Sequence, residues 1–132
     1  MNILFIAHAG LRWVILLVAA VAVIKFALGW LQGAEFKGMD RGLASSFSGL
    51  MDLQVTLGLV FLLWDGFAGG GFPAFRIEHG VAMILAAVVA HLPARWKNAE
   101  PKRRFRNTLF TIVGSLLLVI VGLILLPSGL SR

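Results

Sequence analysis

The chain has 132 residues, of which 59% are hydrophobic and 14% charged, and it contains no cysteine. This small number of charged residues cannot cover the surface of a soluble domain of this size. The composition therefore indicates a membrane protein. Without cysteine there can be no disulfide, iron–sulfur cluster, thiolate zinc site or c-type haem. The net charge of +6 comes from clustered basic residues. In a membrane protein such clusters bear on topology and anionic lipid, and we expect no nucleic-acid partner.

Four segments are long and apolar enough to cross a bilayer, which takes ~20 residues. We expect helices at about 3–31, 43–64, 75–92 and 108–126. The connections are short and contain glycine or proline, which favours antiparallel neighbours. The predicted fold class is therefore all-α: an integral membrane up-down-up-down four-helix bundle, with residues 1–132 forming a single transmembrane domain. The fourth segment is the most uniformly apolar and is expected to face lipid most.

The first segment has no basic residue before its apolar run, and that run is longer than a typical signal-peptide core. We therefore expect it to be retained as a membrane helix.

Basic residues gather in the first and third connections. The third connection and its flanks hold Arg95, Lys97, Lys102, Arg103, Arg104 and Arg106, the first holds Lys37 and Arg41, and the middle connection holds only Arg76. Because short cytoplasmic loops are enriched in lysine and arginine, the two basic connections should be cytoplasmic. Both termini and the glycine-rich middle connection should then lie outside the cytoplasm.

Apart from Lys25 and Arg76, six ionisable residues fall inside the four segments, where each is costly unless it is paired, solvated or ligating. They are His8, Arg12, Asp52, Glu78, His79 and His91, and Gln54 joins them as an amide. His8 and His79 both lie about five residues from the outer end of their segments and so share a depth. Two imidazoles at one depth on two helices suit a b-type haem, whose iron takes one axial ligand from each face. We predict His8 and His79 as the metal ligands.

Three further residues fit a haem site near the outer face. Arg76 lies one turn before His79, and Arg12 lies one turn after His8, so both could hold haem propionates. Glu78 could orient an imidazole or pair with an arginine. The predicted cofactor site therefore comprises these three residues and the two histidines, and no catalytic residue is predicted. Other readings remain open: an interfacial histidine can be structural, and Arg12 could form an ion pair with Asp52 or Glu78.

Three stretches resemble a known family. His8-Ala-Gly-Leu-Arg12-Trp, residues 52–59 and residues 75–79 are similar to small bacterial four-helix membrane proteins labelled cytochrome b or cytochrome-b-like. The resemblance covers nearly the whole chain. It implies haem b bound through His8, Arg12, Glu78 and His79, and a location in the bacterial inner (plasma) membrane. Some relatives have a histidine near the position of Asp52, and this departure argues against a second haem.

These observations predict a membrane electron-transfer protein that binds one haem b within a quinol-linked redox chain. It would be an electron carrier or a subunit of an oxidoreductase complex, with the lipid bilayer and other membrane redox subunits or a second copy as partners. The alternatives are a non-catalytic accessory subunit and a haem-free quinone-binding protein using Arg12, Trp13, Glu78 and His79. A proton pathway through Asp52, Gln54 and His91 ranks last, because their spacing forms no continuous chain.

Overall fold

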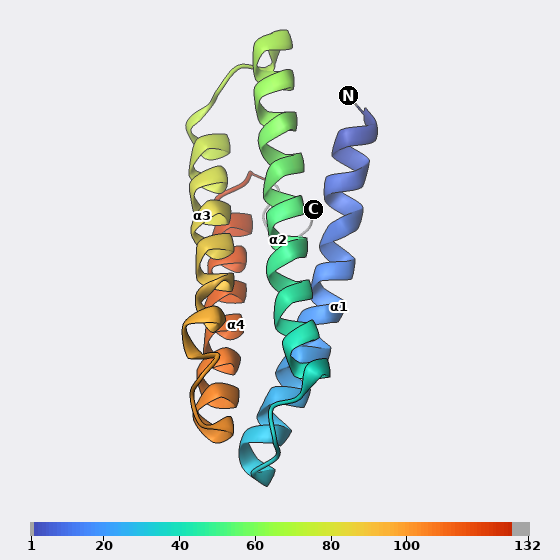
Figure 1. Ribbon diagram of the computed structural model, residues 1–132. Helices are drawn as coiled ribbons and strands as arrows, with labels where there is room; N and C mark the ends of the chain where they lie inside the picture. The colour runs from blue at the N-terminus through green and yellow to red at the C-terminus, as the bar shows by residue number, and fades with distance from the viewer. Residues whose placement is uncertain (1, 128–132) are drawn as a thin grey trace.

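The computed structural model describes residues 2–127 (Figure 1). Four helices make up most of this part of the chain: α1 (Asn2–Gln32), α2 (Gly38–Asp65), α3 (Ala74–Ala90) and α4 (Pro101–Ile124). A π-helical turn, η1 (Gly66–Gly70), extends α2, and a 3-10 segment, η2 (Leu92–Trp96), follows α3. No strand occurs among the described residues, and all four helices are long and apolar enough to cross a membrane. The predicted all-α four-helix transmembrane bundle is confirmed.

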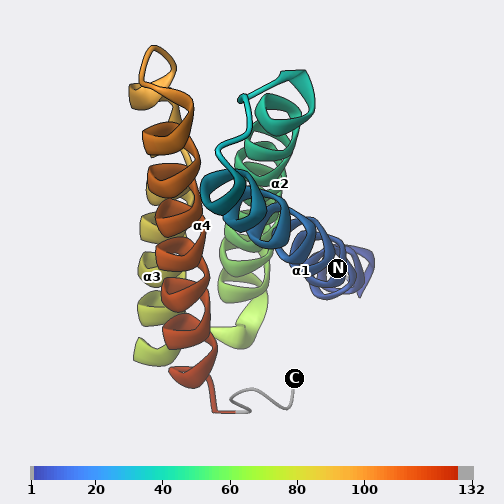
Figure 2. The same cartoon turned by 90° about the horizontal axis from the view of Figure 1, so that it is seen from below.

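The helices form a ring in which each packs against the next and α4 returns to α1. Neighbours in the sequence run antiparallel, and α3 and α4 lie side by side in both views (Figures 1 and 2). In Figure 2, α1 leans at a marked angle to α4, so that its N-terminal end lies far from the α3–α4 pair. The bundle is therefore spread at the end that holds the start of α1.

The opposite end is closely packed. It carries the connections 33–37 and 91–100, which contain basic residues, and is called the basic end below. Phe26, Phe47 and Phe105 are almost completely buried there. Phe36 joins them, with its ring centroid 4.9 Å from that of Phe105. Small residues let the backbones approach at this end, namely Ala19, Ala22, Ala86, Ala87 and Ala90. Because each large aromatic side chain removes ~150–250 Å² from solvent, this cluster anchors the bundle.

A buried acid fixes the start of α2. Asp40 is 1% exposed, accepts a hydrogen bond from the backbone N–H of Lys37 at 2.9 Å, and lies 2.7 Å from Nζ of Lys25. These contacts satisfy a free N–H of the first turn and join α1 to α2. As a result α2 begins at Gly38, before the position expected near residue 43.

The start of α4 also precedes its expected position near residue 108. The helix begins at Pro101, whose fixed φ and missing N–H suit the first helical position. The basic cluster 102–106 is therefore helical, since backbone geometry rather than polarity sets the boundary.

The expectation that the fourth helix faces lipid most is wrong, because α4 has the largest buried share of the four candidate spans and α2 the smallest.

The glycine-rich connection is partly helical. The turn η1 carries the chain past Asp65 to Gly70, into a stretch for which the sequence predicts no helix. Gly69 and Gly71 have φ of +126° and +71°, a region that favours glycine, and the helix stops there. This turn holds Asp65 near the start of α3, where Arg76 lies.

Candidate functional site

A cavity of about 350 Å³ lies between all four helices at the spread end of the bundle. Most of its lining is apolar and comes from leucine, valine, isoleucine, phenylalanine and methionine side chains. Its polar lining consists of His8, Arg12, Gln54, Arg76 and His79. The volume falls within the ~300–1,000 Å³ typical of ligand pockets, which combine an apolar wall with a few polar groups.

His8 is held against α2 by a pair of hydrogen bonds. Its Nδ1 lies 3.1 Å from the backbone carbonyl of Gln54, and the Gln54 amide Nε2 donates to the His8 carbonyl at 2.7 Å. Because a carbonyl only accepts, Nδ1 must be the donor, and the lone pair of the neutral ring is then on Nε2. Gly58 leaves room for the ring, since a Cβ there would lie 2.9 Å from Cε1 of His8.

His79 is held against α4 in the same way. Its Nδ1 lies 2.8 Å from the carbonyl of Gly122. Gly122 is in the last turn of α4, where backbone carbonyls lack a partner within the helix, so the imidazole caps one of them. An imidazole that donates through one nitrogen to a backbone carbonyl is the usual arrangement of a metal-ligating histidine.

Two arginines add positive charge to the cavity wall. The guanidinium of Arg12 lies 4.9 Å from the centroid of the Trp13 ring. Arg76 forms an ion pair with Asp65, with Nη1 2.5 Å from Oδ2. Asp65 is a residue that the sequence analysis missed, because it lies in a predicted loop and only the π turn brings it to Arg76. It fixes the Arg76 side chain and offsets part of its charge.

Gln54 carries a polar atom that the described residues do not satisfy. Its Oε1 is buried and has no hydrogen-bond partner within residues 2–127. A buried acceptor left in this state costs about 1–3 kcal/mol, which a hydrogen-bond donor in the cavity would recover. Gln54 is an amide within the second predicted segment and is not part of the predicted site.

Glu78 does not join the cavity. It is exposed on the outer surface of α3 and is absent from the lining. Successive helical residues are rotated by ~100° about the axis, so a neighbour of His79 in sequence faces elsewhere. Four of the five predicted site residues therefore line one cavity, and the fifth lies outside it.

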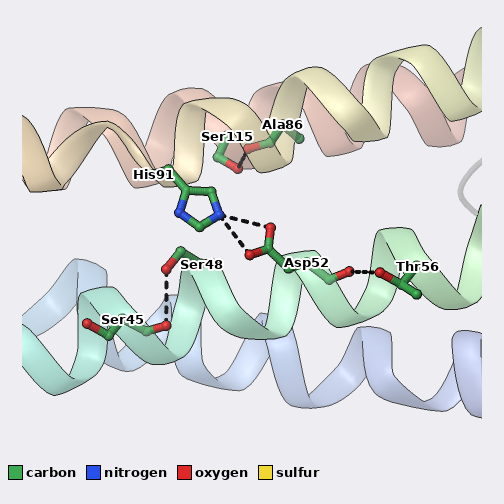
Figure 3. Close-up of polar contacts among 7 residues, drawn as sticks. All are labelled: Ser45, Ser48, Asp52, Thr56, Ala86, His91 and Ser115. Atoms are coloured by element: carbon green, nitrogen blue, oxygen red, sulfur yellow. Dashed lines mark hydrogen bonds and ion pairs between the residues drawn. The ribbon is translucent and has the colours of Figure 1, made fainter.

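Asp52 and His91 also lie outside the cavity and contact each other. Nε2 of His91 is 2.9 Å and 2.8 Å from the two carboxylate oxygens of Asp52 (Figure 3). Asp52 thus pairs with His91 and not with Arg12. Because Gln54 lines the cavity while these two lie on the outer surface, the three residues do not form one polar path.

The donor set suits iron in a porphyrin better than a bare ion. Within residues 2–127, no group of three or more His, Cys, Asp or Glu side chains could hold a metal ion. A bare zinc ion takes three or four protein ligands, whereas haem iron needs only axial ones because the porphyrin supplies the rest. His8 and His79 are the residues of the cavity lining that could supply such ligands, and Arg12 and Arg76 line the same cavity.

The fold and this cavity define an all-α membrane protein whose four helices enclose a pocket with two backbone-anchored histidines. Comparisons with protein-family models, curated proteins and solved structures find no match to the chain.

Proposed function

We propose that this chain is an electron-transfer protein of the bacterial inner (plasma) membrane that binds one haem b in the cavity, as part of a quinol-linked redox chain. His8 and His79 would hold the haem iron. One observation carries the proposal: both histidines line the same cavity, and each Nδ1 contacts a backbone carbonyl of the neighbouring helix.

A bound haem would supply a one-electron iron couple, and the protein would supply its surroundings. The carbonyls of Gln54 and Gly122 orient the imidazoles and raise their basicity. Arg12 and Arg76 lie where they can neutralise propionates. The apolar wall excludes water, and burial together with nearby charge then sets the potential.

Reduced-minus-oxidised absorption spectra of the full chain, produced with adequate haem, test the proposal. The wild-type protein should show a b-type α-band at about one haem per chain, and His8→Ala and His79→Ala should each lose most of it. His91→Ala is the matched control, because His91 lies outside the cavity, and it should keep the band. A wild-type protein without the band, or one that keeps it in both cavity variants, overturns the proposal.

The apolar wall and the His79 imidazole also favour a second candidate, a quinone bound in the cavity without haem. A quinone carbonyl would accept a hydrogen bond from imidazole. Quinone binding by haem-free protein that His79→Ala abolishes would support this candidate over the first.

A further inference from the structure

The Asp52–His91 pair has features that the haem proposal does not use. The two side chains bridge α2 and α3 on the outside of the bundle, and they are 51% and 54% exposed. Asp52 lies within the candidate span Gly38–Gly70 and His91 within Ala74–Trp96. A titratable pair is therefore open to the surroundings of the bundle within two membrane-spanning segments.

This exposure is unusual for ionisable groups in a membrane. Such residues almost always face the bundle interior or a water-filled cavity, because hydrocarbon does not solvate them. Pairing offsets only part of that cost when half of each side chain is exposed. A polar group from outside the chain would complete the solvation.

Within residues 2–127, the Asp52 carboxylate has one hydrogen-bond partner, Nε2 of His91. Two oxygens with about four lone-pair sites share one imidazole nitrogen. The nearby hydroxyls are directed elsewhere, since Ser48 donates to the carbonyl of Ser45 at 3.1 Å and Thr56 to that of Asp52 at 2.8 Å (Figure 3). A ligand that completes this site must therefore donate a hydrogen bond.

We propose that the Asp52–His91 pair binds the hydroxyl group of a quinol dissolved in the bilayer. Because both residues belong to candidate membrane spans and are half exposed, a ligand that partitions into the bilayer can reach the pair. A phenolic hydroxyl is a strong donor to a carboxylate. Val88 lies one helical turn before His91 on the same face of α3 and is exposed, so an apolar surface adjoins the histidine.

The position of the Asp52–His91 pair near one end of the bundle also suits a quinol whose ring carries a long apolar tail. His91 ends α3, and Arg95 follows in η2, so the pair lies close to the basic end of the bundle. A base beside the hydroxyl is useful because a quinol releases protons when it is oxidised. Only the quinol's role as electron source rests on the proposed function, since binding itself needs no haem.

The test uses the full chain in lipid nanodiscs under reducing conditions, with tetramethylhydroquinone as probe and empty nanodiscs as the blank. Equilibrium dialysis should give saturable binding to the protein. Asp52→Asn should weaken binding by roughly 10–100-fold, because it removes a charge-assisted hydrogen bond but keeps the shape. His91→Gln should weaken it as well. Glu78→Gln, which changes another exposed acid, should have no effect.

The dimethyl ether of the probe cannot donate a hydrogen bond and should bind weakly. Equal binding of the ether, of a long-chain alcohol, or of the probe to Asp52→Asn overturns the inference. Haem spectra of the same variants separate the two proposals. A haem band that survives in Asp52→Asn and His91→Gln while binding falls supports two sites. If wild-type protein made with adequate haem shows no haem band while its quinol binding still depends on Asp52, this inference stands and the haem proposal is refuted.

Discussion

The three histidines have one chemistry and two kinds of surroundings. His8 and His79 line the cavity, each with Nδ1 beside a carbonyl, whereas His91 lies outside it beside a carboxylate. Because a carbonyl only accepts, Nδ1 of each cavity histidine is the donor, whereas Nε2 of His91 contacts the carboxylate of Asp52. The position of each histidine in the bundle, and not its residue type, decides which partner it meets.

A substitution at Gly58 tests whether the position of the His8 ring matters for haem binding. A Cβ at this position would lie 2.9 Å from Cε1 of His8, so Gly58→Val should push the ring out of place. If His8 is an axial ligand, haem affinity should fall by at least roughly tenfold, as it does when partners of ligating residues are lost. Haem titration monitored by absorbance measures the change.

Gly49→Val is the matched control for that variant. It makes the same substitution in the same helix, at an exposed position where a Cβ meets nothing within 4 Å. Haem affinity should be unchanged. Equal affinities for the two variants would contradict the assigned role of His8.

The helix α2 belongs to the least buried of the four candidate membrane spans. Asp40 compensates at its first turn by capping the backbone and pairing with Lys25 of α1. The start of α2 is therefore decided jointly by two helices.

Asp40→Ala should destabilise the folded bundle by about 1–2 kcal/mol. The cap contributes about 1 kcal/mol, and the pair adds modestly because Lys25 is partly exposed. Reversible unfolding in mixed micelles measures the free-energy change. Glu35→Ala removes an exposed acid from the same connection and should change stability by less than about 0.5 kcal/mol. A loss no larger in Asp40→Ala than in Glu35→Ala would show that the contact is not stabilising.

The whole molecule has a closed end and an open end. Phenylalanine and alanine side chains close the basic end, while the angle of α1 spreads the other and leaves the cavity. Every wall of the cavity comes from a different helix, so the site exists only in the assembled bundle.

The proposed orientation places the basic end in the cytoplasm. Because the chain has no cysteine, a single cysteine can report the side of each connection. A membrane-impermeant maleimide should label Ala68→Cys in intact bacterial cells with a permeabilised outer envelope. It should label Asn98→Cys only after the inner membrane is opened, since basic loops remain inside. The reverse pattern would place the cavity on the cytoplasmic side.

Local sequence was enough to determine the four helices and their membrane character. Apolar length sets these features, and each segment carries it independently of the others. Helical rise alone predicted one depth for His8 and His79, and the structure places both in the lining of one cavity. The helix starts were predicted less accurately from sequence. The cap at Asp40 acts through hydrogen bonding and Pro101 through its fixed φ, and hydropathy reports neither effect.

The tertiary structure alone decided which polar groups meet. Adjacent residues such as Glu78 and His79 point in different directions, whereas Asp52 and His91 come from different helices and touch. Rotation of each helix about its axis determines these outcomes, and packing against all neighbours sets that rotation. The sequence therefore determined that there are four membrane helices, and the packed bundle determined that His8 and His79 share a cavity and that His91 lies outside it.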